Sequence, residues 1–81
     1  LHSKGVLLNE LQRYDEAIEC FSKAIGINQK HADAFYNKGI SFYGLRKHNE
    51  AIECYNKTIT IDPNYIKAHF NKGISLCELQ R

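Results

Sequence analysis

Apolar and small residues recur at steps of three and four along most of the chain, which is the spacing of a helix that buries one face. The spacing predicts five helices over about residues 1–11, 15–28, 32–45, 49–61 and 66–79. No stretch alternates strongly enough to predict a strand. Short polar segments separate the expected helices, so the pattern favours an all-α fold in which neighbouring helices pack together.

Polar residues and one proline suggest where these helices begin and end. Asp15 and Asn49 precede Glu-Ala-Ile segments and are expected to act as N-caps. Residues 62–64, Asp-Pro-Asn, are expected to end the fourth helix, because proline cannot continue it and disfavours helical geometry in the residue before it. Residues 28–30, Asn-Gln-Lys, stand in the same place after the second helix and form a weaker stop.

The chain repeats itself with a period of 34 residues. Residues 1–31 and 35–65 are identical at 11 of 31 positions, and residues 32–47 and 66–81 at seven of 16. A period of this length predicts a stack of helix pairs. We expect one domain over residues 1–81, as a fragment of a longer array. Its expected units are a partial repeat over residues 1–31, a complete repeat over residues 32–65 and a first helix alone over residues 66–81.

Small residues recur where two helices are expected to touch closely. Gly5, Gly39 and Gly73 each fall within a predicted helix, where glycine costs about 1 kcal/mol relative to alanine. Their shared register predicts that a side chain at any of the three would clash with the partner helix. Ala17 and Ala51 are the matching small residues on the second helices. Large residues are expected to fill the remaining contact points: Leu8, Phe42, Leu76, Phe21 and Tyr55.

Composition and charge exclude several classes of protein. Hydrophobic residues make up 43% of the chain and charged residues 25%, values that are usual for a soluble globular protein and not for a disordered one. No apolar run is long enough to span a bilayer, so no membrane insertion is expected. The net charge of +2 comes from interspersed residues of both signs, which argues against the basic face of a nucleic-acid binder.

Candidate chemistry is sparse. Cys20, Cys54 and Cys77 are odd in number and lack close pairing, which indicates a reducing, intracellular and most simply cytoplasmic location. Cys20 and Cys54 share one repeat position and are expected in the core. The histidines lack the spacing of a helical metal site, and no catalytic or nucleotide-binding motif occurs. We therefore expect no enzymatic activity, no metal and no cofactor.

The order of these residues resembles the tetratricopeptide repeat family, in which aromatic, glycine and alanine positions recur every 34 residues before a closing proline. The middle unit fits this pattern at Phe35, Gly39, Phe42, Ala51, Tyr55 and Pro63. The first unit fits it at Leu1, Gly5, Leu8, Ala17, Phe21 and Ala24. The third fits it at Gly73 and Leu76, while His69 and the lysine before each glycine depart from it. The resemblance implies a right-handed superhelical solenoid of antiparallel helix pairs, with about 2.5 repeats.

The resemblance also implies where a ligand would bind. The first helix of each pair lines the concave side of such arrays, and extended concave surfaces bind partners. The groove residues implied are Tyr36, Asn37, Ile40, Tyr43, Lys67, Phe70, Asn71, Ile74, His2 and Val6. Asparagine amides can clamp a peptide backbone, and aromatic side chains give broad contacts. The alternative for Asn37 and Asn71 is that they belong to the repeat pattern and bind nothing in particular.

Two functions remain open at this point. The first is a non-catalytic protein–protein interaction module that holds an extended peptide or a helix of a partner in its concave groove. The alternative is a self-associating segment that stacks end to end or exchanges helices, because the chain stops after a first helix and leaves Leu76 and Leu79 facing water.

Two more specific ligands are not expected. Some family members hold the acidic tail of heat-shock chaperones, but here only Asn37 and Lys67 match that clamp, whereas His2, Val6 and Asn71 do not. A related repeat of about 35 residues reads RNA one base per unit. The charge balance and the glycine and alanine positions argue against that class.

Overall fold

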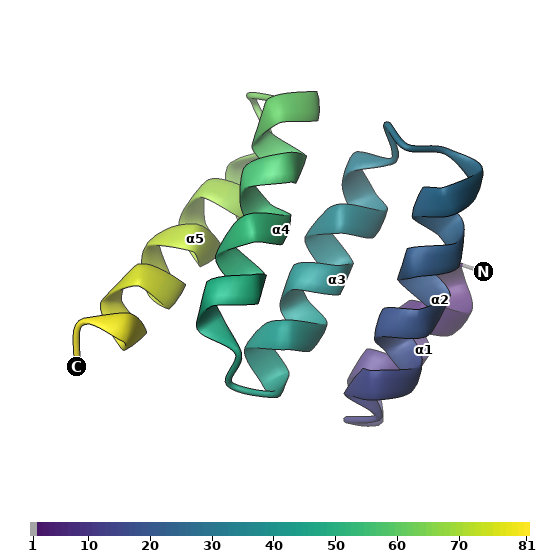
Figure 1. Cartoon of the computed structure of the whole chain (residues 1–81), viewed down its shortest axis with the longest axis horizontal. Coiled ribbons are helices and arrows are strands. Elements are labelled where there is room, and N and C mark those ends of the chain that lie inside the picture. Colours follow the sequence, from purple (N-terminus) through teal and green to yellow (C-terminus); the bar gives the residue numbers. More distant parts are fainter. Residues whose placement is uncertain (1) are drawn as a thin grey trace.

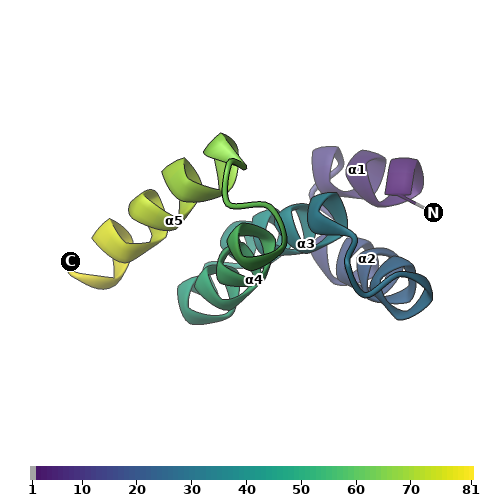
Figure 2. The ribbon, with the colours of Figure 1, turned by 90° about the horizontal axis from the view of Figure 1, so that it is seen from above.

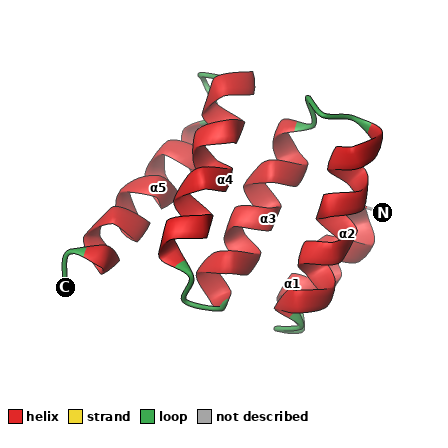
Figure 3. Ribbon diagram, in the orientation of Figure 1, coloured by secondary structure: helices red, strands yellow, loops and turns green. Residues whose placement is uncertain are grey.

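The computed structural model describes residues 2–81, with side chains from residue 4 onward. This part of the chain forms five helices joined by short loops, without a strand (Figures 1 and 3). The helices are α1 (His2–Glu10), α2 (Tyr14–Ile27), α3 (Ala32–Gly44), α4 (His48–Ile61) and α5 (Ile66–Leu79). Each begins and ends within one residue of its predicted position, and the all-α prediction is confirmed.

Consecutive helices run antiparallel and pack against one another, and further contacts connect α1 with α3 (Figure 1). The array measures 33 × 27 × 16 Å. Figure 2 shows α1 and α5 on the same side of α3, with α2 and α4 toward the opposite side. We call the side formed by α1, α3 and α5 the inner face.

The two turns within the helix pairs share one geometry. Gln12 and Arg46 have φ angles of 62° and 63°, in the left-handed region that ends many helices. The N–H of Arg13 donates to the carbonyl of Leu8 at 2.8 Å, and Lys47 makes the equivalent bond in the second turn. Each turn therefore satisfies carbonyls at the end of one helix and leads directly into the next.

This geometry overturns the predicted N-caps. The helices begin at Tyr14 and His48, so Asp15 and Asn49 lie inside the first turn. Arg13 and Lys47 occupy the N-cap positions, and neither α2 nor α4 has a side-chain cap. The prediction was wrong because the left-handed residue reverses the chain within three residues, which starts the second helix one residue early.

Each loop between repeats contains an asparagine or aspartate side chain that accepts a backbone hydrogen bond. Oδ1 of Asn28 accepts from the N–H of Lys30 at 3.0 Å, and Oδ1 of Asp62 accepts from Asn64 at 3.1 Å. The helices α2 and α4 consequently end at repeat-equivalent residues, although only the second loop contains proline. Asn28 therefore stops its helix as well as the Asp-Pro pair does.

Two buried aromatic rings explain the glycines of α1 and α3. Phe21 and Tyr55 are fully buried, each in one of the two core clusters. A Cβ atom at Gly5 would lie 2.6 Å from the Phe21 ring, and one at Gly39 would lie 2.6 Å from the Tyr55 ring. The predicted clash is confirmed at these two positions. It is wrong at Gly73, where an added Cβ atom would meet nothing within 4 Å outside its own helix backbone, because no second helix follows α5 in this sequence.

The helices α4 and α5 also bury polar atoms. The hydroxyls of Tyr55 and Ser75 have no hydrogen-bond partner among the described residues. The hydroxyl of Thr58 donates to the carbonyl of Cys54 at 3.0 Å. Burial raises the pKa of the Tyr55 phenol, and it raises the pKa of the Cys54 thiol to about 11. Cys54 is a core residue as expected, and Cys20 is half-buried against the first cluster.

Candidate functional site

The candidate groove residues lie on the three helices that form the inner face. Val6 belongs to α1, and His2 precedes the residues whose side chains are described. The α3 members are Tyr36, Asn37, Ile40 and Tyr43, and the α5 members are Lys67, Phe70, Asn71 and Ile74.

Polar side chains connect α1 to α3. Nδ2 of Asn9 donates to the backbone carbonyl of Asn37 at 3.2 Å, and the hydroxyl of Ser41 donates to Oδ1 of Asn9 at 2.5 Å. Nδ2 of Asn37 is itself used, since it donates to the carbonyl of Asp33 at 2.9 Å. Asn9 therefore joins two helices of the fold.

A second polar connection joins α3 to α5. Nδ2 of Asn71 donates to the hydroxyl of Tyr36 at 2.8 Å. The Tyr36 ring packs against Tyr55 and Tyr65, with centroids 6.0 and 5.1 Å away. The hydroxyl of Tyr65 donates to Oδ1 of Asp33 at 2.5 Å. Burial raises the pKa of Tyr36, while the bond from Asn71 partly offsets that effect. Tyr36 and Asn71 thus meet as a pair, which their separate positions in the sequence did not predict.

Apolar residues of the inner face become more exposed toward α5. Val6 packs partly against the first core cluster, and Ile40 and Tyr43 pack partly against the second. Ile74 is half-buried, whereas Phe70 is 67% exposed. The apolar area that remains available for contact is therefore concentrated on α5, around Phe70.

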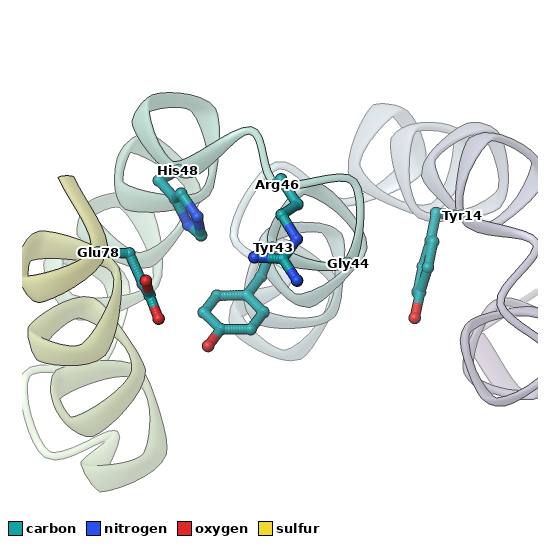
Figure 4. A pocket seen from close by; sticks show the side chains of 6 residues that line it. All are labelled: Tyr14, Tyr43, Gly44, Arg46, His48 and Glu78. Carbon is teal, nitrogen blue, oxygen red and sulfur yellow. The ribbon is translucent and has the colours of Figure 1, made fainter. Parts of the chain in front are cut away.

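A cavity of about 280 Å³ lies at the end of the array where α3 turns into α4 (Figure 4). Its lining residues come from α2, α3, α4, α5 and the turn after α3: Tyr14, Tyr43, Gly44, Arg46, His48 and Glu78. Only Tyr43 had been identified from the sequence as a candidate. The others were missed because they belong to five separate segments, and no spacing rule connects them.

Other kinds of site find little support in the described part of the chain. No three His, Cys, Asp or Glu side chains there are close enough together to hold a metal ion. The carboxylates of Glu16, Glu19, Glu50 and Glu53 are exposed, as expected for charges near helix starts. No helix among residues 2–81 has both the length and the apolar character needed to cross a membrane.

Comparison with known proteins identifies the repeat. Two models of the tetratricopeptide repeat match the chain, one over residues 32–65 and one over residues 5–45. No curated protein matches the chain.

Solved structures share the fold. A crystal structure of MamA has a TM-score of 0.88 and 32% sequence identity, over 91% of this chain and 43% of that one. MamA from Desulfovibrio magneticus RS-1 has a TM-score of 0.92 and 24% identity, over 98% of this chain and 45% of that one. The chain thus spans less than half the length of these MamA chains.

A third structure is the first tetratricopeptide repeat domain of Spaghetti (RPAP3) bound to the HSP90 peptide SRMEEVD. It has a TM-score of 0.70 and 19% identity, over 99% of this chain and 90% of that one, so this likeness concerns the fold alone. The repeat models, by contrast, match residues 5–65 between them. This chain belongs to the tetratricopeptide repeat family.

Proposed function

We propose that the chain is a non-catalytic protein–protein interaction module that binds an extended segment or a helix of a partner on its inner face. The observation that carries this proposal is Phe70, a large aromatic residue that is 67% exposed within a folded helix. An exposed aromatic side chain beside apolar and amide groups is the kind of residue that dominates binding energy at interfaces.

The amide of Asn71 supports the same proposal. Its Nδ2 is occupied by Tyr36, but no donor within the described part of the chain reaches its Oδ1. That oxygen can accept a hydrogen bond from a backbone N–H of a bound peptide, next to the apolar side chains of Phe70 and Ile74. Asn37 is the weaker candidate, because its Nδ2 already donates within its own helix.

The fold-level neighbours are consistent with a peptide partner, since the RPAP3 domain carries a bound peptide. The acidic peptide of that domain is not the expected ligand here. His2, Val6 and Asn71 stand where the chaperone-tail clamp would need Lys, Asn and Arg, which leaves Lys67 as the main cation for such a tail. A partner segment with apolar and backbone contacts fits this face better.

A random-peptide display selection against the chain tests the proposal. Peptides enriched by the parent chain are expected to lose most of their binding to Phe70→Ala and to weaken with Asn71→Ala. The matched control is Ile27→Ala, because Ile27 is 77% exposed but lies at the end of α2, away from the inner face. Enrichment that survives both inner-face substitutions, or that Ile27→Ala abolishes equally, would refute binding at this face.

Self-association is a second candidate function, and one observation favours it. Ser41 and Ser75 occupy one repeat position and are fully buried. The equivalent residue of the first unit, Leu7, is 54% exposed, and Leu76 is 42% exposed at the opposite end of the array. Head-to-tail stacking of copies would cover both apolar ends with surfaces that resemble the contacts between repeats.

Sedimentation velocity over a range of concentrations tests self-association. Head-to-tail stacking predicts an average mass that rises with concentration, and Leu76→Glu is expected to abolish that rise because it places a charge in the apolar contact. Ile27→Glu adds the same charge at an exposed residue outside both ends and is expected to leave the rise intact. A monomer at every concentration would eliminate this function and leave the peptide-binding proposal unaffected.

A further inference from the structure

The cavity at the turn between α3 and α4 gathers hydrogen-bond donors that the fold itself does not use. Figure 4 shows Arg46 between Tyr14 on one side and His48 and Glu78 on the other. In the described part of the chain, no acceptor pairs with the guanidinium of Arg46 or with the hydroxyls of Tyr14 and Tyr43. Arg46 is exposed and the two tyrosines are half-buried, so these groups are available to a ligand that enters the cavity.

His48 gives the clearest sign that a partner is missing. Its Nδ1 atom is buried without a hydrogen-bond partner among the described residues. The Tyr43 ring contacts the imidazole edge to face, with centroids 5.3 Å apart, which holds the imidazole in place beside the cavity. A buried polar nitrogen without a partner is destabilising, so a small rotation of the imidazole that lets this atom hydrogen-bond to a ligand in the cavity would be favourable.

The surrounding backbone adds to the attraction for a negative group. His48 is the first residue of α4, a helix of 14 residues whose N-terminus has no side-chain cap. The unpaired amides of that first turn carry the positive end of the helix dipole. Arg46 is held by the left-handed turn, whose hydrogen bonds fix the residue from which the guanidinium extends.

The cavity is also shaped by a missing side chain. A Cβ atom at Gly44 would clash with the ring of Tyr14, so glycine at the end of α3 lets that ring approach the turn. The repeat-equivalent residues of Gly44 are Glu10 and Glu78, whose side chains would not leave this space. Tyr14 therefore lines the cavity in the middle unit because the sequence has glycine there.

We propose that this cavity binds a phosphate group, free or carried by a phosphorylated side chain, with Arg46 as the central ligand and Tyr14, Tyr43 and His48 as flanking donors. The three terminal oxygens of a phosphate monoester match this number of donors better than the two oxygens of a carboxylate. Glu78 opposes the bound charge from the rim, and its pairing with Arg81 at 3.7 Å reduces that repulsion only in part. The cavity shares Tyr43 with the candidate groove residues, but it contains neither Phe70 nor Asn71, on which the peptide-binding proposal rests.

Titration with small phosphates, followed by the backbone amide NMR signals of His48 and Asn49, tests the site directly. Inorganic phosphate and O-phosphoserine are expected to give saturable shifts with dissociation constants on the order of millimolar. Tighter binding of O-phosphoserine would identify a phosphorylated side chain as the source, and tighter binding of inorganic phosphate would identify the free ion. Sodium chloride at matched ionic strength serves as the blank.

Three variants make the test specific. Arg46→Gln is expected to weaken binding at least about tenfold while keeping the turn, because Gln12 adopts the same φ in the first unit. Glu78→Gln is expected to tighten binding several-fold. Lys30→Gln removes an equal charge from the loop between α2 and α3, at the other end of the helices, and is expected to change nothing.

Three results would overturn the assignment. They are shifts that do not saturate, acetate binding as tight as phosphate binding, and an equal loss of affinity in Arg46→Gln and Lys30→Gln. The first means that no site exists, and the second means that the site selects carboxylates. The third means that the attraction comes from net charge and not from Arg46 in the cavity.

Discussion

Replacing Tyr55 with alanine is expected to lower the free energy of unfolding by about 3–5 kcal/mol. The ring is fully buried, fills the space above Gly39 and contacts Tyr36. The loss approaches the whole stability of a small domain, so much of the population is expected to be unfolded without denaturant. Urea unfolding followed by circular dichroism measures the change.

Tyr55→Phe is the control for this prediction. It keeps the ring and removes a hydroxyl that is buried without a described partner, so stability is expected to stay level or to rise by up to about 1 kcal/mol. Phenylalanine already fills this repeat position in the fold, since Phe21 is the equivalent residue of the first unit. A clear loss of stability in Tyr55→Phe would mean that the hydroxyl has a partner in solution.

The same substitution has a consequence at alkaline pH. Burial raises the pKa of Tyr55, so the folded chain holds this proton more tightly than the unfolded chain does. The stability linked to this proton is complete below the ordinary pKa of about 10 and is lost as the pH rises further. Tyr55→Phe is expected to reduce the slope of stability against pH above 10, while the half-buried phenols of Tyr36 and Tyr65, whose pKa values are also raised, keep part of it.

Alanine substitutions at Gly39 and Gly73 are expected to act in opposite directions. At Gly39 the new Cβ would lie 2.6 Å from the Tyr55 ring and 3.2 Å from the Cβ of Cys54, which predicts a loss of about 1–3 kcal/mol. At Gly73 an added Cβ would meet nothing within 4 Å outside its own helix backbone, so the higher helix propensity of alanine predicts a gain of up to about 1 kcal/mol. Thermal unfolding of the two variants measures the change in stability at each position and whether it is a loss or a gain.

Gly26→Ala is the matched control, because Gly26 also lies in a helix with open space around it. It is expected to be neutral or stabilising, as at Gly73. If Gly73→Ala were destabilising while Gly26→Ala were not, α5 would have to be covered in solution by another helix. That result would favour self-association and would contradict an open face on α5.

The helices and their order were predictable because the 34-residue period shows the same pattern in successive units. Steps of three and four identify a helix, and identical residues in register identify which helices are equivalent. The turns were harder to predict. Nothing marks Gln12 or Arg46 as left-handed residues in the sequence, since glycine is the usual signal for that conformation. The expected caps at Asp15 and Asn49 failed for this reason.

The inner face was predictable in its location and less so in its chemistry. Residue positions place Tyr36 and Asn71 on one side of the array, but their mutual hydrogen bond depends on how α3 and α5 pack. The clash expected at Gly73 failed because a clash requires a neighbour, and register alone does not supply one. The cavity around Arg46 could not be predicted from the sequence for a similar reason, since five segments contribute to it.

The burial of Cys54 gives the chain an internal measure of its own opening. Its Cβ lies beneath the helix that carries Gly39, and burial raises the thiol pKa to about 11, so little reactive thiolate exists near neutral pH while the middle repeat is closed. Cys77 is exposed on α5 and needs no such opening. The ratio of the labelling rates of these two cysteines therefore reports how often α3 and α4 separate under native conditions. Labelling of Cys54 measures the opening, and labelling of Cys77 gives the rate for a thiol that is always exposed.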